Sequence, residues 1–220
     1  MTVSRRLAAE FLGTALLLAV VVGSGIMGEQ LAQGNDAITL LANALATGAG
    51  LVVLIAIFTP VSGAHFNPVV SLAACWFGRL GLRLALAYVV CQVVGGIVGV
   101  AATHLMFGEP MFFASTKIRT GWAQLWSEAV ATFGLLLVIQ GAMRHRAAWM
   151  PLLVGAYITA AYWFTASTSF ANPAVTVARS LSDTFTGIRP ADAPGFIAAQ
   201  LAGGAVAAFL ARWLFAEAGD

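Results

Sequence analysis

The chain has 220 residues, of which 60% are hydrophobic and only 9% carry a charged side chain. Its mean hydropathy of +0.89 lies far above that of globular proteins, which excludes an ordinary water-soluble domain and places the chain in a lipid bilayer. The formal net charge of +2 gives no indication of a nucleic-acid partner.

Six apolar runs reach the length of about 20 residues that a helix needs to cross the hydrocarbon core. In chain order the predicted spans are residues 7–27, 38–59, 82–107, 123–143, 149–168 and 194–214. The first run is long and lacks a cleavage site of the Ala-x-Ala type, so we expect it to stay in the mature protein. These runs predict an all-α membrane protein that forms one transmembrane domain over residues 1–220.

Basic residues gather on one side of the predicted bundle. On the side of the termini lie seven of the eleven, which are Arg5, Arg6, Arg79, Arg83, Arg144, Arg146 and Arg212. On the other side, in longer connections, lie Lys117, Arg119, Arg179 and Arg189. The positive-inside rule therefore predicts an inner (plasma) membrane protein with both termini in the cytoplasm.

Metal and cofactor chemistry is not indicated. Cys75 and Cys91 lie in apolar surroundings and are predicted to be buried thiols that act as small hydrophobic residues. His65, His104 and His145 are far apart in sequence, and no metal-ligand spacing involves them. No nucleophile pattern surrounds His65, so we expect neither an enzyme nor a bound cofactor or metal.

The two halves of the chain share three landmarks in the same order. Each half places a Glu inside its first span (Glu10, Glu128), then an Asn-Pro pair (Asn67, Asn172), then a Gln followed three residues later by a Gly pair. Because each half has three spans, the second copy enters the membrane from the opposite side. The sequence thus predicts an inverted 3+3 repeat, with repeats over about residues 7–107 and 123–215.

Each Asn-Pro pair begins a short apolar segment. Asn is a good N-cap and Pro is favoured at the first helical position, and about 10 residues make a helix about 15 Å long. Such a half-helix covers half a bilayer, so its N-terminus must lie near the midplane. Two half-helices from opposite faces then present backbone N–H groups and Asn amides, which bind a neutral solute and repel a cation.

The segments before the two Asn-Pro pairs are small or polar, which favours extended backbone with carbonyl oxygens exposed along a path. We therefore expect the pathway or its vestibules to be lined by Gly63, Ala64, His65, Thr168 and Phe170.

The motifs Ser62-Gly63-Ala64-His65-Phe66-Asn67-Pro68 and Ala171-Asn172-Pro173-Ala174, in this repeat, resemble those of the aquaporin and aquaglyceroporin (major intrinsic protein) family. The likeness covers essentially the whole chain and implies a passive channel that forms homotetramers with one pore per subunit. It assigns the pore motif to Asn67, Pro68, Val69, Asn172, Pro173 and Ala174.

The resemblance also assigns the two intramembrane carboxylates. Glu10 and Glu128 match family glutamates that accept hydrogen bonds from the re-entrant loops. A proton relay in a coupled transporter is the alternative for these residues. The matching histidine in the family lies near the cytoplasmic mouth of the pore, which implies a lining or gating role for His65.

The narrowest point of the family's pore is set by four positions, which by counting fall on Thr47, Ala160, Ser169 and Val175. An alignment on Gly155 instead brings Tyr162 to the position that we assign to Ala160. Most family members carry Arg where this chain has Val175. We therefore expect a wide, mildly polar constriction that passes uncharged solutes larger than water, and water as well.

Two further departures have open interpretations. Arg179 lies one helical turn beyond Val175, and either faces the outer vestibule or snorkels or pairs with Asp183. Val69 stands where the family has Ala, and alters either the contact between the half-helices or the local pore width.

Residues 172–200 resemble a bacterial branch with Val in place of the filter Arg, some members of which occur with arsenic-resistance genes. This implies arsenite or methylated arsenicals as solutes beside glycerol-like polyols. The alternatives are a water-selective aquaporin and an ion-coupled secondary transporter. Within the predicted spans, the titratable groups available for coupling are Glu10, Glu128 and His104.

Overall fold

The computed structural model describes residues 1–216; residues 217–220 of the predicted 1–220 domain lie outside the described residues. The elements are, in chain order, α1 (Val3–Leu31), α2 (Asp36–Ser62), α3 (Pro68–Trp76), α4 (Leu82–Phe107), α5 (Trp122–His145), the 3₁₀ turn η1 (Ala147–Trp149), α6 (Met150–Phe164), α7 (Pro173–Arg179) and α8 (Ala193–Leu214). The predicted all-α membrane fold is confirmed.

Six stretches within residues 1–216 are long and apolar enough to cross a membrane, and they are α1, α2, α4, α5, η1 with α6, and α8. The remaining helices, α3 and α7, have nine and seven residues. At 1.5 Å per residue they are about 14 Å and about 10 Å long, so neither crosses a bilayer.

The predicted fifth span, residues 149–168, is too long at its C-terminal end. Helix α6 ends at Phe164, and Thr165 is already extended (φ −112°, ψ 138°). Residues 165–171 form the approach to α7 instead. Their side chains are small, apolar or hydroxylated, so in the sequence they resemble part of a span. In the structure most of them are buried in the protein.

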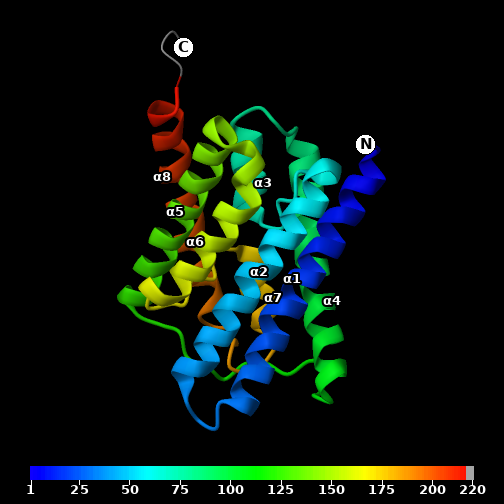
Figure 1. Ribbon diagram of the computed structural model, residues 1–220, viewed down its shortest axis with the longest axis vertical. Coiled ribbons are helices and arrows are strands. Elements are labelled where there is room, and N and C mark those ends of the chain that lie inside the picture. Colours follow the sequence, from blue (N-terminus) through cyan, green and yellow to red (C-terminus); the bar gives the residue numbers. More distant parts are fainter. Residues whose placement is uncertain (217–220) are drawn as a thin grey trace.

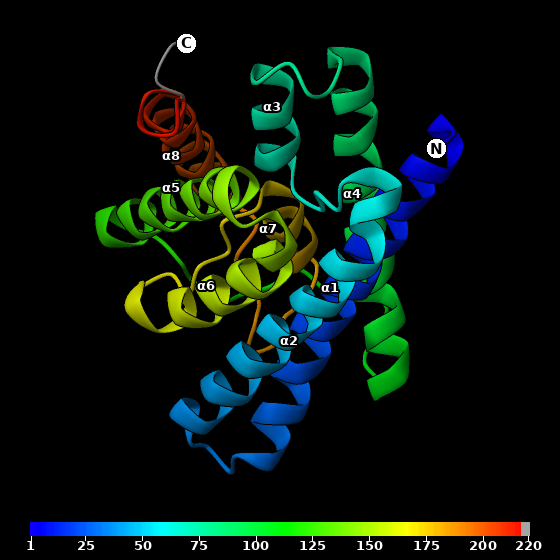
Figure 2. The ribbon, with the colours of Figure 1, turned by 45° about the horizontal axis from the view of Figure 1, so that its top comes forward.

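The helices pack as two equivalent halves (Figures 1 and 2). In the first half, α1 packs on α2 and α4. In the second half, α5 packs on α6 and α8 in the same way. The two halves are joined by the contact between α2 and α6. Both half-helices contact α4 and α8. Figure 1 shows the start of α1 and the end of α8 at the same end of the bundle, with α3 in that half and α7 in the other.

Glycines allow the long helices to approach closely at equivalent positions of the two repeats. A Cβ atom on Gly95 of α4 would overlap the carbonyl oxygen of Phe11 in α1. A Cβ atom on Gly203 of α8 would likewise overlap the carbonyl oxygen of Ala129 in α5. Backbone atoms cannot move aside as a flexible side chain does, so these crossings require Gly.

We therefore expect Gly203→Val to lower the free energy of unfolding by about 1–3 kcal/mol, the usual cost of overpacking. The measurement is the melting temperature of the detergent-purified protein by size-exclusion chromatography. Ala205→Val is the matched control, because Ala205 is on the same helix and is exposed. Equal melting temperatures for the two variants would contradict this account of the crossing.

Candidate solute pathway

Both half-helices begin at an Asn whose side chain caps its own helix. Asn67 has extended backbone, and its Oδ1 accepts a hydrogen bond from Val69 N at 2.9 Å. Oδ1 of Asn172 accepts from Ala174 N at 2.9 Å and Val175 N at 3.3 Å. With its oxygen fixed on the helix, each Asn can turn only its Nδ2 group toward the partner repeat.

The two Asn side chains donate across the pseudo-two-fold axis. Nδ2 of Asn67 donates to the carbonyl oxygen of Ala171, and Nδ2 of Asn172 donates to the carbonyl oxygen of Phe66, each at 2.8 Å. An amide nitrogen carries two N–H groups, and both Asn residues line the main cavity. Each therefore has a second donor for a solute in the pathway.

The loops before the half-helices adopt a rare backbone conformation at matching positions. Ala64 and Phe66 in the first loop, and Ser169 and Ala171 in the second, have φ between 48° and 51°. Non-Gly residues avoid this region at a cost of about 1–3 kcal/mol each. The surrounding hydrogen bonds must therefore hold the loops in place.

Glu10 provides those bonds for the first loop. Its carboxylate accepts from the Ser62 hydroxyl (2.6 Å), His65 N (3.0 Å), Phe66 N (2.8 Å) and the Gln92 amide (2.7 Å). Glu10 is completely buried. Four donors satisfy a charge that would otherwise be costly to bury.

Glu128 holds the second loop in the same way. Its carboxylate accepts from Phe170 N and Ala171 N, both at 2.8 Å, and from the Gln200 amide at 2.6 Å. The Gln200 amide also donates to the Thr176 hydroxyl of α7 at 2.9 Å. The third span of this repeat thus positions the carboxylate and the half-helix together, as Gln92 does with Ser71 of α3.

A cavity of about 470 Å³ passes both Asn residues. It extends from Arg6 and Arg79 at the end with the termini to Val175 and Arg179 beyond the second Asn. Its lining among the described residues includes no Asp or Glu. The loop residues Gly63, Ala64, His65, Ser169 and Phe170 also line it.

The constriction predicted by counting needs one correction. Thr47, Ser169 and Val175 line the cavity, but Ala160 does not and is exposed on the outer face of α6. Tyr162 lines the cavity in its place, with its hydroxyl oxygen 3.3 Å from Oγ1 of Thr47. Tyr162 therefore replaces Ala160 as the candidate for the fourth position, and it is aromatic where we expected a methyl group.

Gly155 was the sequence signal for Tyr162. It lies two helical turns before Tyr162 on α6. A Cβ atom at Gly155 would lie 2.6 Å from the carbonyl oxygen of Gly48 in α2. This close crossing fixes which face of α6 turns inward. Counting back from Asn172 without gaps misses this inward-facing residue by two positions.

The structure also locates the other residues that the sequence analysis named. Thr168 is not among the cavity-lining residues, and its hydroxyl lies 3.5 Å from Nη1 of Arg119. Val69 points away from the cavity and packs with Leu136 and Ala207, so it affects helix packing rather than pore width. Pro68, Pro173 and Ala174 are likewise not among the residues that line the cavity. Cys75 and Cys91 are half-buried rather than buried.

Arg179 is fully buried and lines the cavity, so it does not snorkel. Its Nε donates to the carbonyl oxygen of Thr186, and its guanidinium carbon lies 3.4 Å from the centre of the Phe170 ring. Asp183 is not its partner, because that carboxylate accepts from Thr116 N at 2.8 Å.

A second arginine that the sequence did not single out lies nearby. Arg119, from the connection between α4 and α5, donates to Gly187 O at 2.8 Å and Ser167 O at 3.0 Å. Burial lowers its pKa to about 10, which still leaves it protonated at neutral pH. Two buried positive charges therefore lie near the end of the pathway beyond Asn172.

The opposite mouth of the cavity is bridged by side chains. Arg79 reaches from the connection after α3 to α5, donating to Gln140 Oε1 at 2.8 Å and approaching Met143 Sδ at 3.0 Å. Nε of Arg6 donates to the Tyr88 hydroxyl at 2.8 Å. The side chains of Arg6 and Arg79 make this mouth of the cavity basic as well.

The architecture of two capped half-helices facing one cavity is that of a membrane channel, and the sequence comparison agrees. The family model for the major intrinsic proteins matches residues 1–171. The chain belongs to the major intrinsic protein family; it is a channel and not an enzyme.

Individual relatives refine this placement. The chain is 57% identical over 215 residues to the aquaglyceroporin AqpS of Rhizobium meliloti (strain 1021), covering 98% of this chain and 92% of that protein. It is 32% identical over 146 residues to aquaporin NIP1-1 of Arabidopsis thaliana, covering 62% of this chain and 48% of that protein. The X-ray structure of the aquaglyceroporin from Plasmodium falciparum matches the fold with a TM-score of 0.77 at 20% identity, over 95% of each chain.

We expect Glu128→Ala to destabilise the protein by about 1–3 kcal/mol for each backbone donor it leaves unpaired, namely Phe170 N and Ala171 N. Glu128→Gln keeps one acceptor oxygen and is expected to lose less. Melting temperatures in detergent, compared with Glu29→Ala at an exposed site, test this. A Glu128→Ala protein as stable as the Glu29→Ala control would show that the carboxylate does not hold the loop.

Proposed function

We propose that this protein passes small uncharged polar solutes larger than water, such as glycerol-like polyols, arsenite or methylated arsenicals, and that water also passes. The observation that carries the proposal is the cavity that runs past both Asn residues with a mixed polar and apolar wall. A polyol presents hydroxyl groups on one side and carbon on the other, so such a wall suits it.

The constriction supports this solute class. Thr47, Tyr162 and Ser169 bring hydroxyl groups to the cavity, whereas Val175 brings only methyl groups. Val175 is shorter than the Arg that most family members carry, and it leaves room for a solute larger than water. Pore diameter and lining groups together decide which solute passes.

Water selectivity is the second candidate, and Tyr162 is the observation that favours it. The Tyr162 ring occupies the place that we had assigned to the methyl group of Ala160, and it approaches Thr47 across the cavity. A narrower passage reduces the advantage that Val175 gives to larger solutes.

The residues that line the cavity favour a channel that excludes cations over a transporter that is coupled to them. Glu10 and Glu128 do not line the cavity and have their oxygens occupied by loop donors. The third titratable candidate, His104, is buried against Met111 O and the Ser182 hydroxyl, both at 2.9 Å. These contacts support a passive channel over an ion-coupled transporter.

We place the protein in the inner membrane with both termini in the cytoplasm, because basic residues flank the spans on that side. The bundle over residues 1–220 acts as one channel domain with repeats at about 7–107 and 123–215. We also propose a homotetramer with one pore per subunit, as the family resemblance implies.

Reconstitution into vesicles tests the function. Light scattering is expected to show water, glycerol and arsenite entry above the rate of empty vesicles. Val175→Arg is expected to reduce glycerol entry more than water entry, because a long side chain with donors narrows the constriction. No flux of any of the three solutes would refute the channel, and equal losses of glycerol and water would refute the role of Val175.

The assignment of Tyr162 is tested by a pair of variants on α6. Tyr162→Ala is expected to raise glycerol entry several-fold relative to water, because it removes the ring from the constriction. Ala160→Tyr adds a ring on the exposed face and is expected to leave both rates unchanged. The reverse pattern would return the filter position to Ala160.

A further inference from the structure

The guanidinium group of Arg179 has unused donors at the pathway. Its Nε bonds to Thr186 O, and the Phe170 ring covers one face. The two terminal nitrogens donate to no residue within the described range 1–216, although the side chain is only 1% exposed. Because Arg179 lines the cavity, these donors are available to a molecule inside it.

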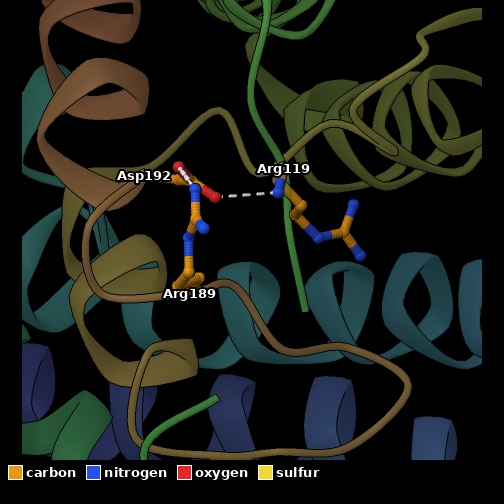
Figure 3. Close-up of polar contacts among 3 residues, drawn as sticks. All are labelled: Arg119, Arg189 and Asp192. Atoms are coloured by element: carbon orange, nitrogen blue, oxygen red, sulfur yellow. Dashed lines mark hydrogen bonds and ion pairs between the residues drawn. The ribbon is translucent and has the colours of Figure 1, made fainter. Parts of the chain in front are cut away.

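Within residues 1–216, no carboxylate forms an ion pair with Arg179. Arg119 adds a second guanidinium 4.9 Å from the same Phe170 ring, and it too bonds only to carbonyl and hydroxyl oxygens. Asp192 accepts from the backbone N of Arg119 at 2.9 Å and pairs with Arg189 at 2.8 Å. Figure 3 shows the guanidinium of Arg119 pointing away from that carboxylate.

Glu128 is a buried carboxylate close to this end, and its oxygens are directed to the loop. Glu128 has its two oxygens occupied by Phe170 N, Ala171 N and the Gln200 amide. No Asp or Glu is among the described residues that line the cavity. Among the described residues, two guanidinium groups therefore lie near one buried carboxylate that bonds to neither, which leaves an excess of positive charge beside Arg179.

A further donor without a partner lies at the same place. The hydroxyl oxygen of Ser169 is buried and has no hydrogen-bond partner among the described residues, and Ser169 lines the cavity with Arg179. Val175 lies one helical turn before Arg179 and has no hydrogen-bond donor in its side chain. It therefore does not compete with Arg179 for a molecule in the cavity. A guanidinium fork is suited to two oxygens on one central atom, and charge shortens and strengthens such bonds.

We infer that Arg179 and Ser169 form a binding site for small singly charged oxyanions of the carboxylate type in the outer part of the pathway. A bound anion obstructs the passage of neutral solutes. The inhibition of flux rests on the proposed function, whereas binding of the anion does not.

Formate is the probe, added as its sodium salt in place of sodium chloride at constant ionic strength. Glycerol entry into vesicles containing the wild-type protein is expected to fall as formate rises. Saturation-transfer NMR of formate with the purified protein measures binding independently of flux. Arg179→Gln is expected to weaken both effects by about tenfold or more, because a charge-assisted fork is lost.

Two further variants make the outcome decisive. Arg179→Lys keeps the charge without the fork, and its formate effect is expected to be several-fold weaker than that of the wild type. Arg83→Gln removes an exposed charge in the first turn of α4 and is expected to leave the formate effects unchanged. If Arg179→Gln does not fold, as judged by its melting temperature, Arg179→Lys decides the matter.

Formate that acts no more strongly than chloride on the wild type would overturn the inference, as would full sensitivity in Arg179→Lys. Glycerol flux without any formate binding would refute this site and leave the channel intact. Formate binding without flux of any neutral solute would refute the proposed function and leave this site intact.

Discussion

The structure depends on two helix N-termini that meet inside the membrane with every cap and loop held in place. Each Asn caps its own half-helix through Oδ1 and bonds to the opposite loop through Nδ2, at 2.8 Å in both directions. In a bilayer core no water can replace such bonds, so the arrangement is stable only if protein groups complete it. Glu10 and Glu128 do so by holding the strained loops that carry the accepting carbonyl groups.

The same constraint produces the character of the pathway. Because backbone and amide donors face inward while the carboxylates stay behind the loops, the lining is polar on one side and carries no acidic residue within the described part of the chain. Basic groups at both ends, Arg79 and Arg179, add to the positive ends of the half-helices. The lining offers hydrogen-bonding groups to a neutral solute, and the proposed anion site rests on the terminal nitrogens of Arg179, whose Nε is bonded to Thr186 O.

Sequence patterns with a local cause were predicted well. The lengths of the apolar runs predicted the spans, because the thickness of the bilayer sets the length of a spanning helix. The Asn-Pro pairs predicted the starts of the half-helices, because capping involves only neighbouring residues. Predictions that depended on counting across a loop were weaker. Ala160 was placed in the constriction and Thr168 in a span, since neither the end of α6 at Phe164 nor the positive φ of the loop residues is visible in composition.

By itself, the sequence determined the membrane environment, the six spans and the inverted repeat, because these follow from hydrophobic length, local capping and order along the chain. The tertiary structure alone decided that Tyr162 faces the cavity, that Val69 faces away from it, and that Arg179 is buried against Phe170 with free donors. These outcomes depend on how each helix is rotated about its axis. That rotation is set by contacts between distant segments, such as Gly48 with Gly155, which no single stretch of sequence contains.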